Sequence, residues 1–276
     1  RDIAGDSMLL NYVLFQAGLG TVHIAVGDNL VQRRFATDLM RLNKSFFIKR
    51  SETGARKIYA AMKQSSAYIH HAMSEGDSIW IAQSEGRAKD GLDTTDPAVI
   101  KMIALAHNKR PWSELLPEIN LVPLAISYEY DPCDMMKARE LHEIEQHGHY
   151  EKPPNEDLIS LATGLGGFKG HVHLAFGTPI SGDLDADQIA TEVDRQVVAG
   201  LKAYPINHWA FSELAVQHGG EYAEFLPAAN AIKSSVNDGV AEERYQRCPE
   251  AYRPFWLASY GNLLLNKGRQ GLLDGP

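Results

Sequence analysis

Apolar residues in the first half of the chain alternate between helical spacing and short continuous runs. The segments with helical spacing are residues 7–17, 31–42 and 54–74. The short apolar runs, which are typical of strands, are residues 23–26, 45–49 and 78–83. Helices and strands that alternate in this way predict a largely parallel sheet with helices on its faces.

The second half of the chain is less regular. Pro97 begins another helix, and the longest strand-like run, residues 120–130, predicts a central strand in which Pro123 marks a bulge or bend. Further along we expect a helix over residues 132–147, a strand over 170–176, and a capped helix over 183–204. From His208 onward the pattern indicates mostly helix and no further strand.

These elements predict an α/β fold with a mostly parallel central sheet flanked by helices and a helical C-terminal region. A chain of 276 residues is long enough for one large domain with its own core. We expect an α/β domain over residues 1–180 and a helical extension over residues 181–276, packed on the same domain.

The net charge of −8 is distributed unevenly. Residues 30–70 contain nine Lys or Arg against two acidic residues, a local charge of +7, so the remainder carries −15. An acidic protein is a poor candidate for nucleic-acid binding. The basic segment would suit a phosphorylated metabolite or an anionic lipid surface, or it is simply a solvated helix face.

The cysteine and histidine positions favour neither disulfides nor a metal centre. Cys133 and Cys248 are far apart in sequence, which suggests no zinc site and agrees with a reducing cytoplasm. His171 and His173 share one strand face, where surface histidines are commoner than ligands. We therefore expect no metal in the functional site.

Five polar or bent motifs follow one another at the ends of apolar segments. They are Arg1 to Asp6, Gly27-Asp28-Asn29, Phe46 to Arg50, Ser84-Glu85-Gly86-Arg87, and Leu121-Val122-Pro123. In an α/β protein, strand ends deliver such groups to a shared crevice. The ordered series therefore predicts one site.

The chemistry of these groups suits a phosphorylated alcohol. Lys49 and Arg50 end a strand on opposite faces, so at most one of them need reach a substrate phosphate directly. The alternative is a surface charge pair that ends the strand. Glu85 would accept a hydrogen bond from a substrate hydroxyl, Gly86 would let the ligand approach the backbone, and Arg87 adds a cation. An ordinary turn would also explain this glycine.

Asp6 has two interpretations. An aspartate just before a helix is usually its N-cap. Transfer of an acyl group to an alcohol, however, needs a base, usually a histidine that a carboxylate holds in its productive tautomer. The chain as given has no histidine before Asp6.

The first half of the chain resembles the glycerol-3-phosphate and 1-acylglycerol-3-phosphate acyltransferase superfamily. The family signature of a histidine, four residues and an aspartate resembles the region from Arg1 to Leu10. The later family motifs are similar to Gly27-Asp28-Asn29-Leu30, Phe46 to Arg50, Glu85-Gly86-Arg87 and Leu121-Val122-Pro123. The resemblance covers about residues 1–130.

The resemblance implies roles for individual residues. Asp6 would orient the catalytic histidine, and Lys49 or Arg50 would bind the acceptor phosphate. Glu85 and Gly86 would bind the glycerol hydroxyl side. The remaining substrate-binding residues of the matching motifs are Gly27, Asn29 and Arg87.

The resemblance also implies the partners of the site. A fatty acyl group would pass from acyl-CoA or acyl-carrier protein, as co-substrate, to a phosphorylated glycerol or lysophospholipid, with no cofactor and no metal. Such a bacterial enzyme of phospholipid synthesis would be cytoplasmic and peripherally bound to an anionic membrane surface. Two alternatives stay open: a non-catalytic phosphate- or phospholipid-binding module, and an acyltransferase with another lipid acceptor.

Two features depart from the family pattern. A histidine directly before Arg1 would be separated from Asp6 by five residues instead of four, and Lys89-Asp90 stands where a small hydroxyl residue is common. The catalytic histidine is expected upstream of Arg1. We therefore expect the chain as given to fold and bind ligand but to be close to inactive.

Overall fold

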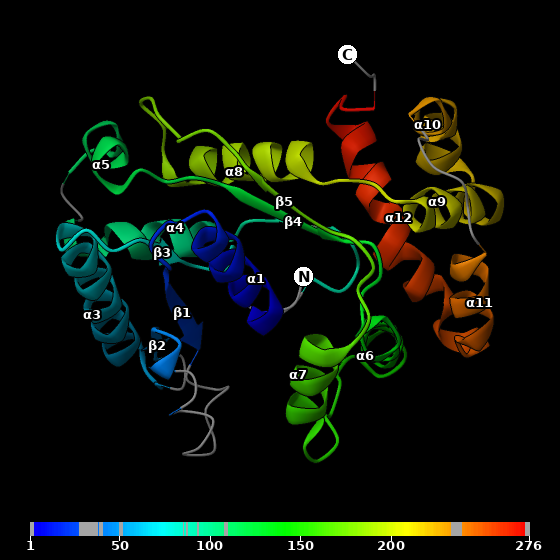
Figure 1. Ribbon diagram of the computed structural model, residues 1–276, viewed down its shortest axis with the longest axis horizontal. Helices are drawn as coiled ribbons and strands as arrows, with labels where there is room; N and C mark the ends of the chain where they lie inside the picture. The colour runs from blue at the N-terminus through cyan, green and yellow to red at the C-terminus, as the bar shows by residue number, and fades with distance from the viewer. Residues whose placement is uncertain are drawn as a thin grey trace.

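The computed structural model describes residues 3–27, 38, 41–49, 52–84, 86, 88–92, 94–107, 110–232 and 239–273 (Figure 1). Its N-terminal part contains a three-stranded parallel sheet in the order β2-β1-β3. The elements of this part are α1 (Ile3–Gln16), β1 (His23–Gly27), β2 (Ser45–Ile48), α3 (Ala55–Ser74), β3 (Ile79–Trp80), α4 (Pro97–Ala104), the 3-10 helix Leu105–His107 and α5 (Trp112–Ile119).

The parallel sheet is buried on both faces. On one face, Ala25 and Ile48 of the strands pack with Ile69 of α3 and Met102 of α4. The opposite face forms a cluster with the N-terminal helix, and its buried members are Leu10, Val22, Ile24 and Val26. Burial on both faces explains why these strands read as continuous apolar runs.

A second sheet consists of β4 (Leu124–Tyr128) and β5 (Val172–Phe176), which pair antiparallel with Leu124 opposite Phe176. The expectation of a central strand over residues 120–130 is therefore wrong, because within the described residues β4 pairs only with β5. Pro123 precedes the strand and does not form a bulge inside it; its carbonyl oxygen accepts from Gly177 N at 2.8 Å. Proline has no N–H to contribute to a ladder, so the strand starts after it.

The remaining elements are helices. They are α6 (Asp134–His147), α7 (Glu156–Gly166), α8 (Ala186–Gly200), α9 (Pro205–His218), α10 (Gly220–Ala231), α11 (Val240–Arg247), the 3-10 helix Glu250–Tyr252 and α12 (Arg253–Arg269). Figure 1 shows α8 running along the β4–β5 sheet, and α9 to α12 gathered at one end of the molecule, away from α3. The α/β class, the parallel sheet with flanking helices and the helical C-terminal region are thus confirmed.

The buried carboxylate of Asp134 in α6 accepts hydrogen bonds from the C-terminal helices α11 and α12. Asp134 Oδ2 accepts hydrogen bonds from Arg244 Nη2 at 2.6 Å, Trp256 Nε1 at 2.8 Å and Tyr260 Oη at 2.9 Å. A buried charge is stable only when it is paired and hydrogen-bonded in this way. The three donors come from α11 and α12, so this network fixes where those helices dock.

No helix among the described residues has the length and apolar character required to cross a bilayer.

Candidate active site

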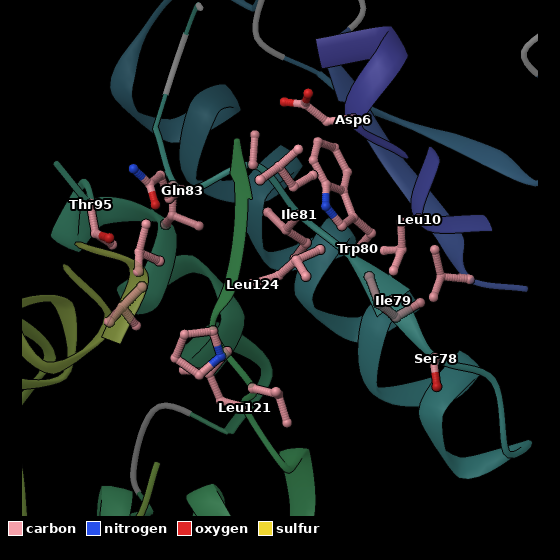
Figure 2. A pocket seen from close by; sticks show the side chains of 18 of the residues that line it. Asp6, Leu10, Ser78, Ile79, Trp80, Ile81, Gln83, Thr95, Leu121 and Leu124 are labelled. Carbon is pink, nitrogen blue, oxygen red and sulfur yellow. The ribbon is translucent and has the colours of Figure 1, made fainter. Parts of the chain in front are cut away.

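A cavity of about 1110 Å³ lies between the parallel sheet and the β4–β5 sheet. Figure 2 shows Ile79, Trp80 and Ile81 along one wall, Leu121 and Leu124 on the facing segment, and Asp6 above the Trp80 indole. Further apolar lining comes from α1, α4 and α8, and includes Leu10, Leu14, Val99, Ile103, Val193 and Val197. Polar side chains of the loop that follows β3 also line the cavity, and they include Gln83, Ser84, Lys89, Thr94 and Thr95; Ser78 lines it from the residue before β3.

Asp6 is brought to this cavity by α1. The helix already extends to Ile3, so Asp6 lies inside its first turn, and the N-cap interpretation of Asp6 is wrong. The residue is only 6% exposed, and Tyr128 Oη donates to its Oδ1 at 2.7 Å. A carboxylate in the first turn is also favoured by the helix dipole. Asp6 is therefore held in one orientation at the cavity wall.

Gly86 also lines the cavity, on the loop that follows β3. Its φ of +84° lies in the left-handed region, although an added Cβ would meet nothing within 4 Å. Glycine is therefore required here by backbone conformation and not by lack of space. Its neighbours Glu85 and Arg87 lie outside the described residues.

Gly27 and Lys49 are placed together but away from the cavity lining. Gly27 ends β1 opposite Ile48 of β2, and the exposed Lys49 follows directly. Neither residue belongs to the lining that contains Asp6 and Gly86. Asn29 and Arg50, from the same two motifs, lie outside the described residues.

The structure adds lining residues that the sequence did not single out as site residues. Lys44 lines the cavity and donates to Thr21 O at 3.3 Å, and Lys89 lines it while pairing with Glu140 Oε1 at 2.9 Å. Glu118 also lines it, and hydrogen bonds from Arg110 lower the pKa of that carboxyl. Lys44 was visible in sequence only as one cation of the basic segment, and nothing local marked Lys89 as a partner of Glu140.

The described lining holds carboxylates, including Asp6 and Glu118. No histidine is found among the described residues that line the cavity. Within the described part of the chain there is also no cluster of three His, Cys, Asp or Glu residues suited to a metal ion. The arrangement can orient a catalytic group through Asp6 and can enclose an apolar ligand.

Residues 3–127 match the profile of the acyltransferase family. The homology to known enzymes is distant. The chain is 28% identical over 185 residues to the glycerol-3-phosphate acyltransferase of Hamiltonella defensa subsp. Acyrthosiphon pisum (strain 5AT), which covers 66% of this chain and 21% of that protein.

Two further relatives carry the same name. The glycerol-3-phosphate acyltransferase of Shewanella sp. (strain W3-18-1) is 29% identical over 184 residues, covering 64% of this chain and 20% of that protein. The one from Alteromonas mediterranea (strain DSM 17117 / CIP 110805 / LMG 28347 / Deep ecotype) is 28% identical over the same length and share of each chain. The chain thus spans about a fifth of the length of these relatives. No solved structure matches it.

Proposed function

We propose that this protein transfers a fatty acyl group from acyl-CoA or acyl-carrier protein to the hydroxyl of glycerol 3-phosphate or a lysoglycerol phosphate. The observation that carries the proposal is the position of Asp6: a buried, hydrogen-bonded carboxylate at the wall of a large apolar cavity, in a segment that matches the acyltransferase family. The names of the relatives support the glycerol-phosphate acceptor.

The general base in this proposal is a histidine upstream of Asp6 in the chain. Asp6 accepts a hydrogen bond from the histidine N–H and so fixes the ring tautomer. The other ring nitrogen takes the proton from the acceptor hydroxyl, whose oxygen attacks the thioester carbonyl. When the tetrahedral intermediate collapses, the C–S bond breaks, the histidine returns the proton to the thiolate sulfur, and the ester and free thiol leave.

The acceptor is held by the two groups of polar residues. Lys49 or Arg50 binds the phosphate, together with Gly27 and Asn29, and this assignment of Lys49 is supported by its exposure beside Gly27. Glu85 and Gly86 bind the glycerol hydroxyl side, with Arg87 as a second cation. Charge-assisted hydrogen bonds of this kind are the strong ones, so they would dominate acceptor affinity.

The acyl chain occupies the apolar part of the cavity. Ligand pockets usually measure about 300–1,000 Å³, and the volume here of about 1110 Å³ suits a long aliphatic group. Apolar side chains from β3, α4 and α8 face this space, including Ile79, Ile81, Val99 and Val193. Burying an alkyl chain among them contributes about 0.8 kcal/mol per CH₂.

We further propose that the protein binds the inner face of the cell membrane peripherally. Helix α1 buries polar side chains and exposes aromatic ones. Asp6, Ser7 and Asn11 are buried, while Tyr12 is 60% and Phe15 70% exposed. An exposed apolar face is a mark of a lipid or protein contact. Leu10 and Leu14, on the buried side of the same helix, line the cavity.

The test is acceptor-dependent thiol release from acyl-CoA by a chain extended upstream of Arg1, with the given chain beside it. Glycerol 3-phosphate and 1-acylglycerol 3-phosphate serve as alternative acceptors. We expect release by the extended chain only, and we expect Asp6→Asn to reduce it by about 10⁴-fold, as for other carboxylates that hold a histidine tautomer.

Asp187→Asn is the matched control, since Asp187 is an exposed carboxylate in the first turn of another helix. It should leave the rate unchanged. Equal rates for Asp6→Asn and wild type would overturn the role of Asp6. A folded extended chain that binds glycerol 3-phosphate yet releases no thiol would establish a binding module instead.

A further inference from the structure

The loop between β3 and α4 is closed at its base by specific hydrogen bonds. Asp96 N donates to Gln83 O at 2.9 Å, which brings the two ends of the loop together. Thr95 then donates twice to Asp194 Oδ1 on α8, through its N at 2.7 Å and its Oγ1 at 2.6 Å. Gly86 of the proposed acceptor motif lies within this loop and lines the cavity.

The middle of the same loop rests on α12, far away in sequence. Asn262 Nδ2 donates to Asp90 O at 2.7 Å across 172 residues of chain. The next residue, Gly91, is buried with a φ of +78°, and an added Cβ would lie 2.8 Å from Ser259 O. Any other residue at position 91 would both strain the backbone and push the loop off the helix.

The amide of Asn262 is held in the orientation that this contact needs. Tyr222 Oη donates to Asn262 Oδ1 at 2.6 Å, while the carbonyl of Asp90 can only accept. The nitrogen must therefore face the loop. One residue earlier in the loop, Lys89 pairs with Glu140 of α6. Helices α6 and α12 thus both contact the short segment from Lys89 to Gly91.

We propose that α12 positions the acceptor-binding loop at Gly86 by holding Asp90 and Gly91, with Asn262 as the positioning residue. The inference rests on the proposed acyltransferase function. It gives a role to a helix beyond residues 3–127, the part that matches the acyltransferase family.

The proposal predicts different effects of the Asn262 contact on acceptor binding and on donor binding. Acceptor affinity depends on a loop held in its binding conformation, because an unheld loop must be ordered at the expense of binding free energy. The acyl chain contacts apolar side chains of β3, α4 and α8, which Asn262 does not hold. Loss of the Asn262 contact should therefore weaken the acceptor alone.

The experiment compares Asn262→Ala and the isosteric Asn262→Asp, which lacks the N–H donor, in the full-length protein. KM for glycerol 3-phosphate and KM for acyl-CoA are measured separately, and the backbone amides of residues 88–92 are followed by hydrogen exchange. We expect an increase of about tenfold in acceptor KM, as for one lost hydrogen bond, an acyl-CoA KM within twofold, and faster exchange in the loop.

Asn266→Ala is the matched control, the same residue type one turn further along α12. It should change neither KM nor the exchange of the loop. An unchanged acceptor KM in both Asn262 variants, or equal rises in both KM values, would overturn the positioning role. If the wild-type protein transfers no acyl group, the proposed function has failed. Unchanged hydrogen exchange of residues 88–92 in the Asn262 variants would refute the proposal that Asn262 holds the loop.

Discussion

The carboxylate of Asp6 has little contact with water, and a buried carboxylate depends on the donors around it. Tyr128, itself 6% exposed, provides one of them from the end of β4. The pair joins α1 to the second sheet. In the proposed mechanism Tyr128 therefore has both a structural and a positioning role.

Tyr128→Phe should destabilise the fold and lower activity together. Removing the hydroxyl takes a donor from a buried carboxylate, which costs about 1–3 kcal/mol of unfolding free energy. Urea denaturation measures the loss, and thiol release measures the activity. Tyr12→Phe, at an exposed position of α1, is the control and should stay within about 0.5 kcal/mol of wild type. Equal stability of both variants would contradict the importance of the Tyr128–Asp6 bond.

Of the two cysteines, Cys248 has a thiol whose pKa is clearly shifted. Burial raises the pKa of its thiol to about 11, and the nearby charge of Asp134 acts in the same direction. In the unfolded chain the thiol deprotonates near its ordinary pKa of about 8.5. Above that pH the unfolded state binds fewer protons than the folded state, so the free energy of unfolding falls as the pH rises.

We expect this fall between about pH 8.5 and about pH 11, with a slope of the order of 1 kcal/mol per pH unit from this thiol. The contribution is fully present below the unfolded pKa and is lost as the pH passes through the folded pKa. Chemical denaturation at several pH values measures it. Because tyrosines titrate in the same range, Cys248→Ala is the reference. Parallel curves for the two proteins would show that Cys248 contributes nothing.

At the scale of elements, α8 is the cavity wall with the best-defined start. Asp185 Oδ1 accepts from Gln188 N at 2.8 Å, and Gln188 Oε1 accepts from Asp185 N at 2.9 Å, which forms a capping box. Val193 and Val197 of the same helix line the cavity. The cap therefore stabilises a helix that the acyl site needs.

Asp185→Ala should lower the free energy of unfolding by about 1 kcal/mol, as loss of an N-cap does. Asp183→Ala is the matched control, an acidic residue two positions earlier and outside the helix. It should have little effect. Urea denaturation distinguishes the variants, and identical midpoints would contradict the capping role.

Elements with local signals were predicted closely. The apolar spacing of residues 54–74 gave α3 (Ala55–Ser74), and the acidic residues 183–187 gave the start of α8. The run 78–83 gave a strand of only two residues, Ile79–Trp80. The sequence does not say how many residues of an apolar run find a partner strand, because that depends on the neighbouring elements.

The parts of the site that depend on distant contacts were not predictable. Asp6 was named from its motif, but its partner Tyr128 lies 122 residues away and Asn262 lies 172 residues from Asp90. No local pattern marks either pair. The split between two sheets was also missed, since residues 120–130 are apolar enough for a central strand and the choice of partner is tertiary.

At the scale of the molecule, exposed aromatic side chains and exposed cations are the features that bear on lipid binding. Residues 7–27 contain no Asp, Glu, Lys or Arg, and α1 packs against α7, after which Phe168 is 71% exposed. The described cations of the basic segment are all exposed: Arg41, Lys44, Lys49, Arg56, Lys57 and Lys63. Apolar area and positive charge together are what binds an anionic lipid surface.

Vesicles with anionic lipid should therefore bind the protein better than neutral vesicles at low salt, and salt should weaken the difference. Phe15→Ser and Phe168→Ser should reduce binding to both kinds of vesicle by removing apolar burial. Val216→Ser, an 83% exposed residue on α9, is the control. Co-sedimentation measures all four proteins. Equal binding of wild type to neutral and anionic vesicles would remove the electrostatic part of the proposal.

The contact of Asp90 with Asn262 can form in a newly made chain only after both residues have been synthesised. Ribosomes add about 5–20 residues per second, so the 172 residues from Gly91 to Asn262 take roughly ten to thirty seconds to synthesise. During that interval the loop after β3 exists without its anchor, and the cavity still lacks α8 for part of the time. The apolar walls are then open to solvent. Holdase chaperones should therefore bind nascent chains stalled before residue 262 more than chains stalled after α12 has emerged.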